Sequence, residues 1–360
     1  MRSPGDAPSR RITAGQPSPG CGVTAPPAPP AFTGWLGDRV PGLTPPLRLA
    51  RVGAGQSNIT SLVTDADGRE WVLRHPPAGA PAGAHDVHRE ARVLRALAGS
   101  GVPVPTVVAE GADAGGIDGP FYVMDRAPGA PLVDESDASA CTARRRRELS
   151  VETVEVLARL HALDPAAVGL EGLGRPTGFL ERQTARTVRN WAAWGEGSAA
   201  TPAWEECRRR ITATVPRQQR TVITHGDYRL SNLLVRDGRI TAVLDWELCT
   251  LGDPLADLAW LLDDWRSPQE PAIVIPRPTR AGGFATRTEI VDAYAARTGL
   301  DVGDLDHYCA FTHWKAATLL QGVLVRRRSG SMGEHGALDL RSLQDSVEHL
   351  LDGALRLLGR

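Results

Sequence analysis

The chain has 360 residues, of which 42% are hydrophobic and 23% are charged, an ordinary balance for a globular protein of about two domains. Its net charge is −1 and its pI is about 6.8, so no global field indicates a nucleic-acid or membrane partner. The five cysteines are widely spaced and form no Cys-x-x-Cys pair, which argues against a disulfide framework or zinc site and predicts a cytoplasmic protein. Since no stretch of about 18 apolar residues occurs, the sequence predicts no membrane span.

The N-terminal segment, residues 1–34, is predicted to be a disordered tail. It is rich in Pro, Gly, Ala and Ser and contains the run Pro26-Pro27-Ala28-Pro29-Pro30. Such a composition offers too little apolar surface to offset the entropy of ordering. We therefore expect order to begin near Trp35.

A glycine-rich turn between two predicted strands follows. Residues 47–52 and 59–64 have strand character, and the turn between them carries Gly53, Gly55, Ser57 and Asn58. Glycines let backbone N–H groups approach phosphate oxygens, and Ser57 adds a hydroxyl donor. Glycine hairpins are common, so this turn alone is a weak signal for a nucleotide site.

The next predicted strand, residues 71–74, ends in Arg74, a cation that could contact phosphates. It precedes a predicted helix whose apolar residues recur at helical spacing from Val87 to Leu97. Glu90 lies on this helix and is either the ion-pair partner of Arg74 or a solvent-exposed side chain. After further strands ending in residues 121–124, the segment 125–129 is predicted to be a hinge.

The most informative stretch runs His225-Gly226-Asp227, then Asn232, an Asp237-Gly238 turn, and Leu244-Asp245. Phosphoryl transfer needs a carboxylate to accept the proton of a hydroxyl, and an Asn and a second carboxylate to hold Mg²⁺. Asp227, Asn232 and Asp245 have this order and spacing. A hairpin between residues 233–235 and 240–244 is expected whether or not the segment is catalytic. A plain hairpin does not, however, explain the spacing of these polar residues.

The remainder is predicted to be mostly helical. Helices are expected over residues 144–163, 255–262, 305–323 and 340–357, and an irregular loop near the acceptor site over residues 267–286. Trp191, Trp194 and Trp204 are expected to pack this part of the chain. Lys315 is the only lysine, whereas arginines are abundant.

These motifs resemble a known family. His-Gly-Asp-x-x-x-x-Asn, Leu-Asp-Trp-Glu and Gly-Asp-Pro-x-x-Asp-Leu-Ala are similar to those of the aminoglycoside phosphotransferase and choline kinase superfamily. The closer resemblance is to kinase-like domains associated with acyl-CoA dehydrogenases, and it covers about Trp35 to the C-terminus. It implies a bilobal, protein-kinase-like α+β fold, with a nucleotide-binding N-lobe (residues 35–125) and a mostly helical C-lobe (residues 126–360).

The resemblance also implies roles for individual residues. Asp227 would be the catalytic base, Asn232 and Asp245 the Mg²⁺ ligands, and Arg74 would replace the usual lysine of the phosphate clamp. Further nucleotide-binding and supporting roles fall on these residues: Gly53, Gly55, Ser57 and Asn58 in the loop, Glu90 beside Arg74, Met124 as gatekeeper, Asp125 and Ala127 in the hinge, and His225 and Asp257 as structural support.

The implied activity is transfer of phosphate from ATP or GTP, with Mg²⁺, to the hydroxyl group of a small molecule, and the relatives imply a hydroxyacyl-CoA. Two alternatives stay open. An aminoglycoside-modifying enzyme would need an acidic acceptor cleft; Asp263, Asp264 and Glu270 supply acid, whereas Arg326–Arg328 oppose it. A nucleotide-binding pseudokinase with a regulatory role is favoured by the arginine at position 74.

Overall fold

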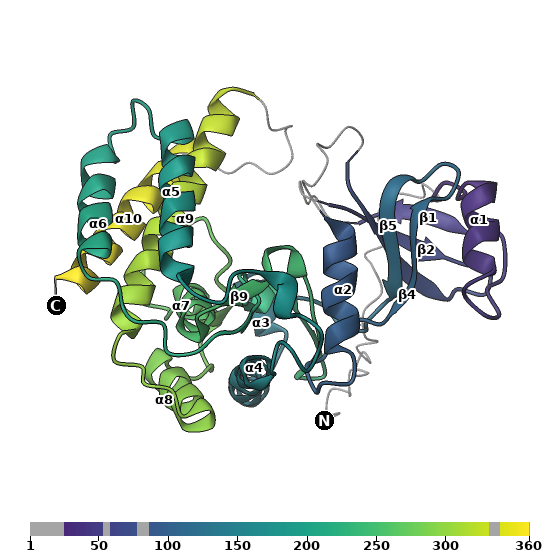
Figure 1. The fold of residues 1–360 in the computed structure, drawn as a ribbon, viewed down its shortest axis with the longest axis horizontal. Coiled ribbons are helices and arrows are strands. Elements are labelled where there is room, and N and C mark those ends of the chain that lie inside the picture. Colours follow the sequence, from purple (N-terminus) through teal and green to yellow (C-terminus); the bar gives the residue numbers. More distant parts are fainter. Residues whose placement is uncertain (1–24, 53–57, 78–85, 331–338, 360) are drawn as a thin grey trace, which may run out of the picture.

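The computed structural model describes residues 25–52, 58–77, 86–330 and 339–359, and it forms two lobes (Figure 1). A small antiparallel sheet with two helices makes the N-lobe, and helices dominate the C-lobe. This confirms the predicted bilobal α+β architecture. Gly53, Gly55 and Ser57 of the predicted phosphate loop lie outside the described residues. Within the described ranges, no helix is long and apolar enough to cross a membrane.

The N-lobe sheet has five strands in the order β1-β2-β3-β5-β4, with every pair antiparallel. One face carries the buried side chains Val63, Leu73 and Val123, all 0% exposed. The strands are β1 (Arg48–Arg51), β2 (Ile59–Thr64), β3 (Glu70–His75), β4 (Val107–Asp113) and β5 (Asp118–Asp125).

The prediction that residues 1–34 are disordered is wrong for the described residues 25–34. Helix α1 (Pro30–Gly37) packs on the outer side of the sheet (Figure 1), and Phe32 is fully buried there beside Phe121. Upstream of it, the Ala28 amide donates to the Leu47 carbonyl at 2.8 Å, so the chain extends the β1 edge. The prolines misled the prediction because proline is tolerated at a sheet edge and at the first position of a helix, where its missing N–H is not needed.

Helix α2 (Val87–Leu97) lies between the sheet and the C-lobe (Figure 1). The side chain of Asp86 caps its first turn by accepting from the Arg89 amide at 3.0 Å. Arg89 in turn donates to the carbonyls of Leu173 and Cys249 in the C-lobe. Because these acceptors are more than 80 residues away in the sequence, Arg89 ties the position of α2 to the second lobe.

The C-lobe is built around α4, α7 and α9, and its tryptophans pack as expected. Trp191 and Trp204 stack with ring centroids 4.8 Å apart, and Trp204 also contacts Trp314, whereas Trp194 is only half-buried. Its helices are α3 (Glu135–Ser139), α4 (Ala143–Ala162), α5 (Phe179–Trp194), α6 (Thr201–Ala213), α7 (Pro254–Asp264), α8 (Arg287–Thr298), α9 (Leu305–Arg328) and α10 (Leu340–Leu358).

Two short strand pairs frame the central segment of the C-lobe. Strand β6 (Val222–Thr224) pairs with β9 (Thr250–Gly252), and β7 (Leu233–Arg236) pairs with β8 (Arg239–Val243). The predicted hairpin is confirmed: Asp237 and Gly238 both have positive φ, 53° and 73°, as a two-residue hairpin turn requires. The segment 267–286 is irregular apart from one short 3₁₀ turn, also as expected.

Replacement of Phe32 by Ala should lower the free energy of unfolding by about 3–5 kcal/mol, because a fully buried aromatic ring is removed from the outer core of the N-lobe. The measurement is urea-induced unfolding followed by circular dichroism. Val133→Ala, at a side chain that is 44% exposed, is the control and should change the stability by less than about 0.5 kcal/mol. Equal stability of Phe32→Ala and the parent protein would show that α1 does not contribute to the fold.

Candidate active site

Helix α7 holds the loop His225-Gly226-Asp227, which lies between β6 and β7, through hydrogen bonds to the loop backbone. The buried carboxylate of Asp257 accepts the backbone N–H groups of His225 at 2.6 Å and Gly226 at 2.8 Å. Gly226 has φ +86°, and a Cβ there would meet the carbonyl oxygen of Leu248 at 2.8 Å, so the loop needs glycine at this point. Asp257 would therefore brace the loop through its two hydrogen bonds from the loop backbone.

Asp257 is part of a buried hydrogen-bond chain. His161 Nε2 donates to its Oδ2 at 3.3 Å, and the Tyr294 hydroxyl donates to His161 Nδ1 at 2.6 Å. Burial acts to raise the pKa of Asp257, but the hydrogen bond and charge of His161 and the nearby amides outweigh it, so the net pKa lies below its usual value. Asp257 is thus an anion that its surroundings hold ionised.

Asp227 projects from the loop with both carboxylate oxygens engaged. Oδ1 accepts the indole N–H of Trp260 at 2.6 Å, and Oδ2 accepts the side-chain amide of Asn232 at 2.8 Å. His225 does not contact this carboxylate. Its Nδ1 accepts the Asp227 amide at 3.1 Å and its Nε2 donates to the Leu244 carbonyl at 2.8 Å, which places it inside the loop.

Trp260 was missed by the sequence interpretation. It lies three residues after Asp257 on α7, and residues at this spacing share one face of a helix. The helix that braces the loop backbone through Asp257 therefore also orients the carboxylate of Asp227. The spacing Asp257-x-x-Trp260 was the available signal.

Asn232 and Asp245 are suited to hold Mg²⁺. The amide nitrogen of Asn232 donates to both the side chain and the carbonyl of Asp227, which directs its oxygen outward. The Leu244 amide donates to the Asn232 carbonyl at 2.8 Å, so the two predicted ligands are coupled through the backbone. Asp245 adopts a left-handed conformation (φ 66°), and its side chain stays 37% exposed. Two protein oxygens fit a metal that takes its other ligands from phosphates and water.

The ion pair expected between Arg74 and Glu90 is present at 3.1 Å, and Arg74 also lies 3.4 Å from Asp245 Oδ1. Glu90 accepts hydrogen bonds from Asn58 Nδ2 at 2.6 Å and from the Tyr122 hydroxyl at 3.0 Å. Burial raises the pKa of Glu90, although the charge of Arg74 opposes that shift. The Nε of Arg74 is buried and has no partner among the described residues, so this cation keeps a free donor at the predicted phosphate position.

The segment predicted to be a hinge, residues 125–129, begins at the last residue of β5 and leads into the C-lobe. Met124 is buried and pairs with Val72 in the sheet, and the Asp125 amide donates to the Thr106 carbonyl at 2.8 Å. Ala127 follows on a segment without regular structure. That the backbone of Asp125 and Ala127 contacts a base remains a prediction.

Three further charged residues lie near Asp227; sequence interpretation considered Asp264 for an acidic acceptor cleft but did not place Lys315 or Arg229 here. Lys315 Nζ lies 4.3 Å from the centre of the Trp260 ring, and Arg229 Nε lies 3.6 Å from Asp227 Oδ1. Burial lowers the pKa of Lys315, while the charge of Asp227 acts in the opposite direction. Asp264 is buried, both of its oxygens lack partners in the described structure, and burial raises its pKa to about 7.

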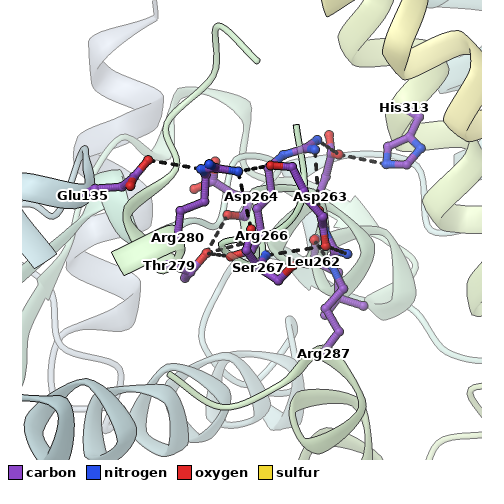
Figure 2. Close-up of polar contacts among 11 residues, drawn as sticks. Glu135, Leu262, Asp263, Asp264, Arg266, Ser267, Thr279, Arg280, Arg287 and His313 are labelled. Carbon is purple, nitrogen blue, oxygen red and sulfur yellow. Dashed lines mark hydrogen bonds and ion pairs between the residues drawn. The ribbon is translucent and has the colours of Figure 1, made fainter. Parts of the chain in front are cut away.

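The other acidic residues considered for an acceptor cleft are already paired. Asp263 lies 3.1 Å from Arg266 and 2.9 Å from His313, as Figure 2 shows. Glu270 accepts two hydrogen bonds from Arg287, at 2.6 and 2.9 Å. Since these carboxylates are neutralised by neighbours, they form no open acidic surface.

The sequence matches the profile of the phosphotransferase enzyme family over residues 48–295, more than half of the chain. The protein belongs to this family. It is similar to acyl-CoA dehydrogenase family member 10 of Mus musculus, with 34% identity over 315 residues. That match covers 85% of this chain but only 29% of the mouse protein, so the chain corresponds to less than a third of that relative.

Solved structures of the family have the same fold. A candidate aminoglycoside phosphotransferase from Ralstonia eutropha superposes with a TM-score of 0.75 and 30% identity, covering 91% of this chain and 98% of its own. Aminoglycoside phosphotransferase APH(4)-Ia, in a complex of a thermostable mutant with AMP-PNP and hygromycin B, superposes with a TM-score of 0.58 over 89% of this chain and 98% of its own. At 18% identity, the second likeness shows the fold alone.

Asp264 should make the stability of the protein depend on pH. Its folded pKa of about 7 lies above the unfolded value near 3.9, so the folded state binds the extra proton and stability falls as pH rises through this interval. Asp264→Asn removes the titrating group. Between pH 5 and pH 8, the free energy of unfolding of this variant should therefore fall by roughly 2–4 kcal/mol less than that of the parent. Urea unfolding at both pH values measures the difference.

The matched control is Asp292→Asn, an exposed carboxylate on α8, which should keep the pH slope of the parent protein. An unchanged slope in Asp264→Asn would show that this carboxyl group titrates at its ordinary pH.

Proposed function

We propose that the protein is a Mg²⁺-dependent kinase that transfers the γ-phosphate of ATP or GTP to the hydroxyl group of a small anionic acceptor. The observation that carries this proposal is the carboxylate of Asp227, which is oriented by Asn232 and Trp260 at the end of a loop braced by Asp257. Membership of the phosphotransferase family supports the class of reaction.

The chemistry assigns one role to each group. The acceptor oxygen forms a bond to the γ-phosphorus while the bond from that phosphorus to the β–γ bridging oxygen breaks, and the nucleoside diphosphate leaves. The hydroxyl proton passes to Asp227, whose two oxygens each keep a lone pair besides the one used by Trp260 or Asn232. Asn232 and Asp245 would hold Mg²⁺, which when bound neutralises charge on the phosphates.

Arg74 would act as the phosphate clamp. Glu90 positions the guanidinium, which keeps its Nε free, and the planar fork can donate to two phosphate oxygens. The guanidinium also lies 3.4 Å from Asp245 Oδ1. The proposed phosphate clamp and one proposed Mg²⁺ ligand therefore lie next to one another. This geometry supports a catalytic site with arginine in place of lysine over a pseudokinase.

The charges near Asp227 favour an anionic acceptor. Lys315 lies over the Trp260 ring and Arg229 lies beside Asp227, whereas Asp263 and Glu270 are paired with arginines and His313. A polycationic aminoglycoside bound here would bring its positive charges close to these two cations. Like charges brought together in a site are destabilising, so this acceptor is disfavoured.

Among anionic hydroxyl compounds, we propose a hydroxyacyl-CoA. The mouse relative is named as an acyl-CoA dehydrogenase family member, which supports an acyl-CoA acceptor. The candidate aminoglycoside phosphotransferase from Ralstonia eutropha favours the alternative, a hydroxyl group on an aminoglycoside. Activity should be measured with both acceptors in one panel, because the charge argument predicts that the hydroxyacyl-CoA is the better acceptor.

Asp227→Asn should reduce turnover by roughly 10²–10⁴-fold, because the amide cannot accept the hydroxyl proton. Its nucleotide affinity should stay close to that of the parent, because an asparagine at this position keeps a side-chain oxygen that can accept the hydrogen bond from Asn232, the proposed Mg²⁺ ligand. The measurements are release of nucleoside diphosphate across the acceptor panel and calorimetric binding of AMP-PNP with Mg²⁺.

Asp237→Asn is the matched control, because this exposed hairpin residue has a positive φ that Asn also tolerates. It should leave turnover unchanged. Full activity of Asp227→Asn would rule out the proposed base. AMP-PNP that binds the parent protein equally well with and without Mg²⁺ would favour the pseudokinase.

Lys315→Met should raise the acceptor KM by about tenfold or more while the nucleotide KM stays within about twofold, because the lost cation lies over Trp260, the residue that orients the proposed base. Lys315→Arg keeps the charge and should recover part of the loss. Arg341→Met, an exposed position at the start of α10, is the control. The assignment fails if Lys315→Met changes the nucleotide KM instead, or if kanamycin-type drugs are preferred over every hydroxyacyl-CoA.

A further inference from the structure

A cavity of about 660 Å³ lies among helices α7, α8, α9 and α10. Its volume falls within the roughly 300–1,000 Å³ that is common for small-ligand sites. Much of its wall is apolar, formed by Leu262 of α7, Val291 of α8, Leu305 of α9, and Leu350 of α10. We call it the α7–α10 cavity.

The α7–α10 cavity is separate from the candidate active site because it uses the opposite face of α7. Trp260 hydrogen bonds with Asp227 on the face turned toward the catalytic loop. Ala259 and Leu262, one residue before and two after Trp260, line the cavity instead, while Asp227 does not. At about 100° per residue, such neighbours on a helix point to different sides.

One wall of the cavity contains a buried donor that no described residue satisfies, and a buried imidazole nitrogen beside it. Arg266 is 4% exposed, and its Nη2 donates to Asp263 at 3.1 Å, yet its Nε has no partner among the described residues. His313 Nε2 lies 2.9 Å from the same carboxylate, and its Nδ1 is also buried without a partner. Figure 2 shows these three side chains meeting at the end of α7. A buried donor without a partner is destabilising, and an acceptor atom in the cavity would relieve this cost.

Helix α10 brings two further basic groups to this wall, His349 and Arg356. Burial lowers the pKa of His349, and the positive charges of Arg266, Arg356 and His313 lower it further, so basic groups converge here. Among the acids lining the cavity, Asp263 is shared between Arg266 and His313.

The two other acids do not cancel this charge. Glu270 is held by Arg287 at 2.6 Å and lies 3.7 Å from Arg266. Asp306 lies seven residues before His313 on α9, about 10 Å away along the helix axis. The end of the cavity near His313 is therefore basic, and the remainder is largely apolar.

We propose that the α7–α10 cavity binds an amphipathic monoanion, a carboxylate attached to an aliphatic chain. The carboxylate accepts from Arg266, with His313, His349 and Arg356 beside it, and the aliphatic chain lies against the leucine and valine wall. This site is independent of the proposed kinase reaction, since it shares no lining residue with the catalytic loop.

The test is calorimetric titration of the full-length protein with octanoate and, separately, with octan-1-ol, which has the same chain length without the charge. Octanoate should bind at least about tenfold more tightly than octan-1-ol. The double variant His349→Gln/Arg356→Gln should weaken octanoate binding by a similar factor and leave octan-1-ol binding almost unchanged. Arg341→Gln, an exposed arginine on the same helix, is the control for general surface charge.

The proposal is overturned if octanoate does not bind, if it binds no better than octan-1-ol, or if Arg341→Gln weakens it as much as the double variant does. Saturating AMP-PNP with Mg²⁺ should leave octanoate binding in place, and loss of binding would place octanoate in the active site instead. Asp227→Asn should bind octanoate like the parent protein, so a failure of the kinase proposal and a failure of this one give different results.

Discussion

The catalytic loop depends on one buried carboxylate. Asp257 is removed from water, which is costly for an anion, and three donors offset that cost: the amides of His225 and Gly226 and the imidazole of His161. Because two of these donors belong to the loop backbone, ionisation of Asp257 and the shape of the loop support one another. The position of Asp227 follows from that shape.

Helix α7 transmits this constraint in two directions. Asp257 and Trp260 hold the catalytic loop on one face, while Ala259 and Leu262 line a cavity on another. The helix also separates its acids: Asp264 is buried without a partner, whereas Asp263 is neutralised by Arg266 and His313. These two acids are therefore in different surroundings, although they are adjacent in the sequence.

The sequence by itself determined the elements that depend on local patterns. Apolar spacing located the long helices of the C-lobe, and the Asp237-Gly238 pair located a hairpin because few other residues adopt positive φ twice in succession. The offsets from Asp227 to Asn232 and Asp245 also follow from the chain, since a tight loop and a hairpin return these residues to one place. The family motifs determined the bilobal fold.

Only the tertiary structure decided which distant side chains meet. The order of residues 25–34 rests on burial of Phe32 against Phe121, a contact that composition does not record. Lys315 reaches Trp260 across 55 positions, and His313 reaches Asp263 across 50, so neither contact could be obtained from spacing. Local patterns specify helices and turns because these form between near neighbours. The net charge of a site is the sum over all elements that pack there, and packing is set by the whole chain.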